Sequence, residues 1–393
     1  MKLQRILVVK LADVGDLLMI SPALTALRRA HPDAWIDVLA PPKAAATLAA
    51  LPHIDGSLLF DKFGFDRPAA LLNPRRWAEG LSFARQLRAA RYDAVAVMHH
   101  LTTRFGGWKF AALALVSGAK IRAGLDNGRG WFLTHRYLDA GFGALHEAAY
   151  WQQVAVLLGA DPTPLPLAFT PGLADIERAG ELLRPLLNIG GPLVAIHPGT
   201  GGYAPARRWP AGYFAQLARR LHDALDARIV IVGGADVSQW ATRIIESAAL
   251  VGDPRTLNLS EQTTLGELGA VLARCNLYIG SDSGPLHIAT TSGVPVLGIY
   301  GPSNHRAWGP YVPGGAATEF DALTVMPQDW PQPAGHAMLR QSLACSPCLY
   351  REHAVGLRNG CPPRECLDML TPDAAFAAAR LMLAGRLFLR PPV

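Results

Sequence analysis

Short apolar runs alternate with amphipathic stretches along most of the chain, and this alternation predicts strands separated by helices. The first runs are apolar at nearly every position, which is typical of strands buried on both faces of a parallel sheet. The predicted strands cover residues 5–11, 35–40, 92–98 and 120–125, and the predicted helices cover 21–30, 75–91 and 104–117. Because parallel strands need crossover connections, we expect right-handed β-α-β units.

The alternation stops at a proline-rich segment and then begins again. Residues 160–172 read ADPTPLPLAFTPG, and prolines both end helices and stiffen a chain, so this segment is typical of a linker. The strands predicted beyond it cover 193–199, 228–234, 256–260, 276–282 and 294–301, with helices over 211–225, 237–249, 264–274, 285–292 and 372–388. The pattern therefore predicts two doubly wound α/β halves.

The length agrees with two domains, because 393 residues exceed what one ordinary core accommodates. We expect a first Rossmann-like domain over 1–165 and a second over 166–371. The sequence leaves open whether a C-terminal helical segment, 372–393, packs back on the first domain. Ligands of such sheets bind at the carboxyl ends of the strands, so we expect the site in a cleft between the halves.

Composition and charge narrow the class of protein. Half of the residues are hydrophobic and 17% are charged, as in globular proteins, and no apolar run reaches membrane-spanning length. Asp13 and Asp16 interrupt the apolar N-terminal stretch, so it does not fit a signal peptide and a cytoplasmic location is expected. The formal charge of +6 favours anionic partners. No zinc-finger spacing or aromatic RNA-binding strand is present, so nucleic acid is not expected as a partner.

The first strand ends in the sequence KLADVGDLL, which contains Lys10, Asp13, Gly15 and Asp16. Gly15 permits a tight turn before the first helix. The Asp16 carboxylate can cap that helix through its N–H groups, or it can take a proton from an acceptor hydroxyl. Position in the sequence favours neither role. Lys10 and Asp13 are candidates for contacts with the acceptor.

The first strand of the second half runs into HPGTGGYAPARRWP, residues 197–210. Its glycines, Gly201 among them, let the backbone approach a ligand closely, and Thr200 can donate to a phosphate oxygen. Arg207 or Arg208 can neutralise a diphosphate; the alternative is a surface loop with solvated arginines. The loop lacks the phosphate-binding P-loop pattern. The nearby VGGADV, with Asp236, is a weak signal for a further donor contact.

A third polar junction follows the strand at 276–282, in the sequence GSDSGPLHIATTSGVPVLGIYG, residues 280–301. Proline stands at the start of the following helix, where it is favoured. The helix dipole, free N–H groups, hydroxyls and an imidazole converge there, which favours a bound anion, although a buried structural histidine is the alternative. The candidate residues are Asp282, Ser283, Gly284 and His287.

Together these junctions predict a nucleotide diphosphate held by the second half, with a carboxylate supplied by the first. No pair of carboxylates suited to Mg²⁺ ends a strand. Arginine and the helix start must then stabilise the leaving group in place of a metal, and no cofactor is expected.

The sequence resembles the heptosyltransferases, glycosyltransferase family nine. The resemblance rests on ILVVKLADVGDLLMISPALTALRRAHP, HPGTGGYAPARRWP and YIGSDSGPLHIATTSGVPVLGIYGPS, which occur in the family's order. It implies a GT-B architecture with two Rossmann-like halves. It also implies inverting, metal-independent transfer of a heptose-like sugar from an ADP-sugar to the inner core of lipopolysaccharide, a lipid-linked acceptor.

The resemblance also assigns roles to residues. The family's catalytic base, the Asp of its S-x-x-G-D motif, falls on Asp16, while Ala12 or Asp13 replaces the Ser. The family's phosphate-binding hydroxyl falls on Thr200, and its Lys before Trp-Pro is Arg207 here, which keeps the charge but changes the geometry. The anion-binding helix start falls on 282–287.

Two other features remain open. The four C-terminal cysteines can form a structural zinc site or pack as reduced thiols, because the CxxC pair is followed by a pair with a wider spacing; they are Cys345, Cys348, Cys361 and Cys366. The arginines of the helix predicted over 75–91 can face anionic lipid of the inner membrane or simply solvent.

Competing functions use the same features. A sugar-nucleotide epimerase or hydrolase would hold the same diphosphate but needs other acid and base groups. A non-catalytic nucleotide-sugar or lipid-binding protein would not need Asp16. A dinucleotide oxidoreductase is disfavoured, since no G-x-G-x-x-G follows a strand.

Overall fold

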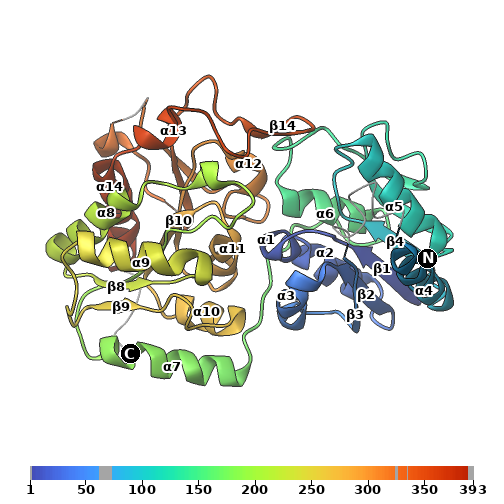
Figure 1. The fold of residues 1–393 in the computed structure, drawn as a ribbon, viewed down its shortest axis with the longest axis horizontal. Coiled ribbons are helices and arrows are strands. Elements are labelled where there is room, and N and C mark those ends of the chain that lie inside the picture. Colours follow the sequence, from blue (N-terminus) through green and yellow to red (C-terminus); the bar gives the residue numbers. More distant parts are fainter. Residues whose placement is uncertain (1, 62–72, 324–325, 334, 388–393) are drawn as a thin grey trace. The chain divides into compact units, whose positions relative to one another are not determined.

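The computed structural model describes residues 2–61, 73–323, 326–333 and 335–387. The chain divides into two compact units, Met1–Ala168 and Phe169–Val393, and the division falls inside the proline-rich segment 160–172. Each unit is built on its own parallel sheet with helices on both faces (Figure 1). The prediction of two Rossmann-like α/β domains is confirmed.

Unit 1 contains a six-stranded sheet in the order β3-β2-β1-β4-β5-β6. Its strands are β1 Arg5–Val9, β2 Trp35–Ala40, β3 Gly56–Leu59, β4 Ala94–Val97, β5 Ile121–Asp126 and β6 His135–Leu138. Its helices are α1 Val14–Leu18, α2 Ser21–Ala30, α3 Ala45–Ala50, α4 Pro74–Ala89, α5 Arg104–Val116 and α6 Glu147–Val156, with a 3₁₀ turn at Pro42–Ala44.

The strand order of unit 1 reverses between β1 and β4. The chain leaves β1 toward β2 and leaves β4 in the opposite direction toward β5, so the two crossovers diverge above the carboxyl ends of β1 and β4. Such a reversal opens a crevice for ligands in doubly wound sheets. Helices α4 and α5 cover one sheet face, where Leu87 and Phe110 pack with Leu7 and Val95 in one hydrophobic cluster.

Unit 2 contains a seven-stranded parallel sheet in the order β12-β13-β11-β10-β7-β8-β9. Its strands are β7 Leu193–His197, β8 Arg228–Ile231, β9 Thr256–Asn258, β10 Leu277–Ser281, β11 Val296–Ile299, β12 Thr318–Asp321 and β13 Ala337–Arg340, and a separate hairpin pairs β14 Leu349–Arg351 with β15 Ala354–Gly356. Its helices are α7 Leu173–Leu187, α8 Ala211–Leu225, α9 Ala235–Ser247, α10 Leu265–Leu272, α11 Gly284–Thr291, α12 His305–Trp308, α13 Glu365–Asp368 and α14 Pro372–Leu387, with 3₁₀ turns at Pro205–Arg207 and Pro327–Asp329.

The strand order of unit 2 reverses between β7 and β10, which are neighbours in the sheet. β7 leads to β8 on one side and β10 leads to β11 on the other. The crevice of this sheet therefore lies above the carboxyl ends of β7 and β10. Both strands are buried at every position, as the unbroken apolar pattern predicts.

The C-terminal helix α14 belongs to the core of unit 2. Ala375, Ala378 and Met382 lie in the same hydrophobic cluster as Phe214 of α8, and α14 contacts both α8 and β10. The sequence had left open a packing of this helix on the first domain; its small apolar side chains instead allow a close approach to α8. Residues 388–393 of the predicted C-terminal segment lie outside the described residues.

Several strands and helices were not predicted from the hydrophobic pattern of the sequence. Strand β12 has the sequence TEFD, in which only Phe320 is buried, so its pattern is too polar to mark a strand. Helix α7 follows the proline-rich segment and contains Pro185 in its last turn. Among the described helices, none combines the length and hydropathy that crossing a bilayer requires.

Candidate functional site

Two polar loops of unit 2 meet at the reversal between β7 and β10. The first loop follows β7 and contains Thr200 and, in a 3₁₀ turn, Arg207. The second follows β10 and leads into α11 through Asp282 and Ser283. Adjacent parallel strands place their carboxyl ends at one sheet edge, so residues 75 positions apart come together there.

An ion pair joins the two loops. Arg207 Nη1 lies 3.2 Å from Asp282 Oδ2, and both side chains are largely buried. Arg207 Nη2 also donates to the backbone carbonyl of Thr200 at 2.8 Å. The guanidinium is therefore held in a fixed orientation by residues of both loops, and a planar, oriented guanidinium suits an anionic ligand.

Helix α11 begins at this ion pair. Its N-cap residue, Ser283, has an extended backbone and makes no side-chain capping bond; its hydroxyl donates instead to the carbonyl of Ser281 at 3.1 Å. The Ser283 hydroxyl therefore accepts no hydrogen bond from the first-turn N–H groups of α11, which carry the positive end of the helix dipole. His287 is buried in the same helix.

Gly199, in the loop after β7, and Gly233, which follows β8, allow close packing against α9. A Cβ built on Gly199 would stand 2.5 Å from Val237 Cγ2, and Gly233, at the end of β8, has a φ of +148° that favours glycine. Gly201 has a φ of +65° and meets no atom nearby. The loop after β7 therefore lies tightly on the start of α9, while its tip at Gly201 is open.

Two predicted donor contacts are placed elsewhere. Arg208 lies over the ring of Trp240 on α9, with its Cζ 5.1 Å from the ring centroid. Asp236 is exposed in the first turn of α9, where a carboxylate complements the helix dipole. The structure thus gathers Thr200, Arg207, Asp282, Ser283 and the start of α11 into one place, with Arg208 and Asp236 beside α9.

The reversal in unit 1 carries a carboxylate above a buried ammonium. Asp16, in the first turn of α1, is partly exposed, and its Oδ1 lies 3.8 Å from Lys10 Nζ. The Lys10 side chain is only 3% exposed and its Nζ stands 4.1 Å from the centroid of the Trp151 ring. Lys10, expected from the sequence to contact an acceptor, contacts Asp16 and the ring of Trp151 in this structure. Asp13 pairs with Lys43 at the surface.

Behind Lys10 lies a buried charged cluster that the sequence reading missed. His100 Nδ1 lies 3.0 Å from Asp139 Oδ2, and its Nε2 lies 2.8 Å from Glu147 Oε1. Burial alone would lower the pKa of His100, but the charge of Glu147 and the hydrogen bonds to both carboxylates outweigh it and raise this pKa to about 9. The imidazole is therefore held protonated at neutral pH.

The same cluster is linked to Lys10 electrostatically. Burial by itself would raise the pKa of Glu147, yet the charges of His100 and then Lys10 hold it below its usual value. A signal for this cluster was present, since the pair of histidines at 99–100 follows Met98 just after β4, at the same sheet edge as Lys10. Asp139 and Glu147 gave no such signal, because only the tertiary fold brings them to His100.

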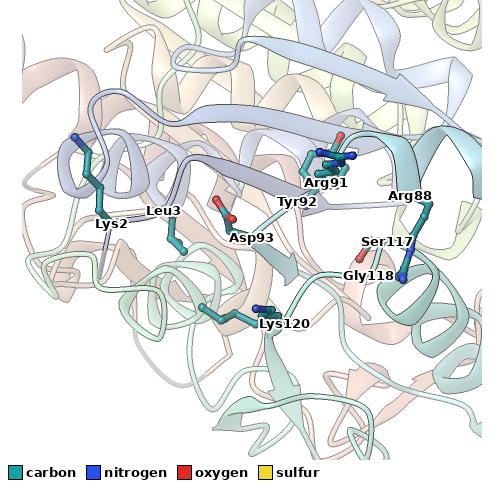
Figure 2. Close-up of a pocket in the computed structure, with 10 residues that line it drawn as sticks. Lys2, Leu3, Arg88, Arg91, Tyr92, Asp93, Ser117, Gly118 and Lys120 are labelled. Carbon is teal, nitrogen blue, oxygen red and sulfur yellow. The ribbon is translucent and has the colours of Figure 1, made fainter.

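The segment that carries Cys361 packs beside the loop after β7, where the Ala206 N–H donates to the carbonyl of Arg358 and Arg364 Nη1 donates to that of Arg208. All five cysteines are free thiols, and within the part of the chain that the structure describes no three His, Cys, Asp or Glu residues are arranged to hold a metal ion. Burial, and then the neighbouring thiols, raise the pKa of Cys366 to about 12. A cavity of about 480 Å³ opens at the amino ends of the unit 1 strands, the edge opposite to Asp16 (Figure 2).

Known proteins resemble this chain in both sequence and fold. Residues 80–319 match glycosyltransferase family 9 (heptosyltransferase), more than half of the chain. Lipopolysaccharide heptosyltransferase 2 of Escherichia coli K12 is 25% identical over 306 residues, which cover 76% of this chain and 83% of that protein. Lipopolysaccharide heptosyltransferase 3 of E. coli is 24% identical over 315 residues, with coverage of 76% and 83%.

Solved structures confirm the expected fold class, the two-domain α/β GT-B class. A family 9 glycosyltransferase from Veillonella parvula superposes with a TM-score of 0.70 at 23% identity, covering 97% of each chain. An E. coli heptosyltransferase solved with ADP-2-deoxy-2-fluoro heptose gives a TM-score of 0.65 at 19% identity, covering 96% of this chain and 99% of that one. The chain is a glycosyltransferase and belongs to glycosyltransferase family 9, the heptosyltransferases.

Proposed function

We propose that the protein transfers a heptose-like sugar from an ADP-sugar to a lipopolysaccharide inner-core acceptor, with inversion at the anomeric carbon and without a metal ion. The observation that carries the proposal is the anchored Arg207 beside the start of α11, at the sheet reversal of unit 2. A relative in the same family was solved with an ADP-heptose analogue, which supports an ADP-sugar as donor.

Unit 2 binds the donor in this proposal. Arg207 and the first-turn N–H groups of α11 contact the diphosphate, and the Thr200 hydroxyl donates to one of its oxygens. His287 supports the start of α11 from its buried position. As the bond between the anomeric carbon and the diphosphate oxygen breaks, negative charge grows on the leaving ADP, and these fixed donors stabilise it.

Unit 1 supplies the base. Asp16 takes the proton of an acceptor hydroxyl, whose oxygen attacks the anomeric carbon on the side opposite to the diphosphate. Lys10 orients the carboxylate through the ion pair between its Nζ and Asp16 Oδ1. Asp13, exposed and paired with Lys43, is proposed to contact the acceptor. We further propose that the enzyme works at the cytoplasmic side of the inner membrane, where its lipid-linked acceptor is anchored.

The substitution Asp16→Asn tests the base directly. We expect kcat for transfer to fall by about 10²–10⁴-fold, the usual contribution of a general base, while the Kd for the ADP-sugar changes less than about threefold. The measurements are release of ADP with acceptor present and calorimetric titration of the ADP-sugar. Asp33→Asn, at an exposed ion pair with Lys2, is the matched control and keeps wild-type turnover. Turnover of Asp16→Asn near that of the control would remove Asp16 from this role.

A further inference from the structure

Helix α5 is apolar on two opposite faces. Its inner face, with Phe110, Ala111 and Ala114, is buried against the sheet. Its outer face carries a stripe at positions i, i+3, i+10 and i+11 that is exposed rather than covered: Phe105 is 55% exposed and Trp108 63%, and Leu115 and Val116 follow them. A helix that is apolar all round is normally buried, so the exposed stripe indicates an apolar partner.

Neighbouring elements enlarge this apolar surface. Trp131, after β5, is exposed and its ring centroid lies 5.0 Å from that of Trp108. Helix α4 packs against α5 and exposes Trp77 and Leu81 one turn apart. We call the exposed apolar side chains of these two packed helices, together with Trp131, the α4–α5 face; they are Trp77, Leu81, Phe105, Trp108, Leu115, Val116 and Trp131.

The surroundings of the α4–α5 face are cationic. From residue 94 to residue 125 the chain contains no Asp or Glu. Arg88 reaches from α4 to Ser117 and Gly118 after α5, and Arg91 and Lys120 line the same cavity (Figure 2). Asp93 also lines this cavity, but its carboxylate accepts hydrogen bonds from the backbone N–H groups of Gln4 and Arg5. No carboxylate of the described residues lies within ion-pair distance of Arg88, Arg91 or Lys120. The side chain of Arg75, named with these arginines from the sequence, lies outside the described part.

We propose that the α4–α5 face docks on a lipid bilayer that contains anionic headgroups. Exposed Trp and Phe side chains bind at the boundary between headgroups and acyl chains, and arginines beside them contact the phosphates. Charge complementarity favours this occupant over a second copy of the chain, since a two-fold contact would bring the same cationic residues face to face. The inference deepens the proposed function by naming the surface that meets the membrane of a lipid-linked acceptor.

Vesicle binding tests the inference without any transfer reaction. The full chain is incubated with vesicles of phosphatidylcholine alone or mixed with phosphatidylglycerol, and the bound fraction is measured by co-sedimentation. We expect the wild type to bind the anionic vesicles, and the double substitution Phe105→Ser/Trp108→Ser to reduce the partition constant about tenfold or more. Leu173→Ser/Val251→Ser is the matched control, because both residues are exposed apolar residues of unit 2 and this variant should bind like the wild type.

A charge variant separates the electrostatic contribution to vesicle binding from the apolar contribution. Arg88→Glu/Arg91→Glu should remove the preference for phosphatidylglycerol and the loss of binding in high salt, since it reverses charges that lie beside the face. The thermal midpoints of these exposed variants should stay close to that of the wild type, which separates lost docking from misfolding.

Three results would overturn the proposal. The first is equal vesicle binding by the wild type and Phe105→Ser/Trp108→Ser. The second is a rise in KM of this variant for a short, lipid-free acceptor, which would make the face a sugar platform. The third is a wild-type dimer in analytical ultracentrifugation that the same substitutions dissociate, which would make it an interface between copies. Absence of transfer with intact vesicle binding would contradict the proposed function alone.

Discussion

The two sheet reversals use the same position in the fold for opposite electrostatic purposes. In unit 2 the residues beyond β7 and β10 present a cation, Arg207, whose own charge is balanced by the buried carboxylate of Asp282. In unit 1 the residues beyond β1 and β4 present a carboxylate, Asp16, balanced by the buried ammonium of Lys10. Each presented group is therefore held by a buried partner of opposite charge.

The two buried partners, Asp282 and Lys10, differ in what stabilises their charges. Asp282 stands at the start of α11, where the helix dipole favours its negative charge. Lys10 has no helix end to favour it and depends on the ring of Trp151 and on the ionised Glu147, which His100 in turn keeps ionised. In unit 2 the buried partner is therefore supported by the helix that it precedes, whereas in unit 1 the buried partner is supported by a network of buried side chains. The following predictions test this difference.

Among substitutions of the cations at the two reversals, removal of the cation in unit 2 should give the larger effect. Arg207→Ala is expected to lower kcat by about 10²–10³-fold and to weaken ADP-sugar binding, because a fixed donor to the leaving group is lost. Arg208→Ala, with its guanidinium on Trp240, should lower kcat less than about tenfold. Steady-state rates and calorimetric Kd values of both variants decide this, and equal losses would refute the distinction between the two arginines.

Removal of the cation in unit 1 should give a smaller effect of a different kind. Lys10→Met is expected to lower kcat about tenfold and to move the acidic limb of the pH–rate profile to higher pH, because a carboxylate without a neighbouring cation binds its proton more tightly. Lys10→Arg should restore most of the rate. An unchanged pH profile in Lys10→Met would mean that Lys10 acts only as a core residue.

The buried network should make the stability of unit 1 depend on pH. The pKa of His100 is raised from 6.5 to about 9, so its stabilising contribution is complete below about pH 6.5 and is lost as the pH rises through about 9. We expect the free energy of unfolding to fall by on the order of 2 kcal/mol more in the wild type than in His100→Asn across that interval. Urea titrations at a series of pH values measure it; parallel pH dependences would contradict the protonated state of His100.

The smallest change is expected on removal of divalent ions. Because Arg207 and the start of α11 supply the positive charge at the diphosphate, chelation with EDTA should change kcat less than about twofold, and Mg²⁺ should not raise it. The assay is ADP release with each addition. A loss of activity in EDTA that magnesium restores would assign the leaving-group charge to a metal ion and not to the protein.

Local sequence was sufficient for much of the fold and for one side of the site. The helix predicted over 211–225 is α8 to the residue, and the predicted strand at 35–40 is β2, because a strong apolar periodicity marks both. The junction at 280–287 could be recognised because an apolar strand, an N-cap serine and a proline follow one another directly. The short polar strand β12 could not, because its place in the sheet depends on pairing with β13.

Sequence by itself determined that two parallel-sheet units form and that polar residues follow their central strands, since both follow from periodicity and neighbouring residues. Only the tertiary structure decided which of those residues meet. It joined Arg207 to Asp282, turned Arg208 toward Trp240, buried Lys10 under Asp16 and brought Asp139 and Glu147 to His100. The physical reason is that side-chain direction and burial depend on residues far apart in the chain, and charge pairing in a buried place depends on both.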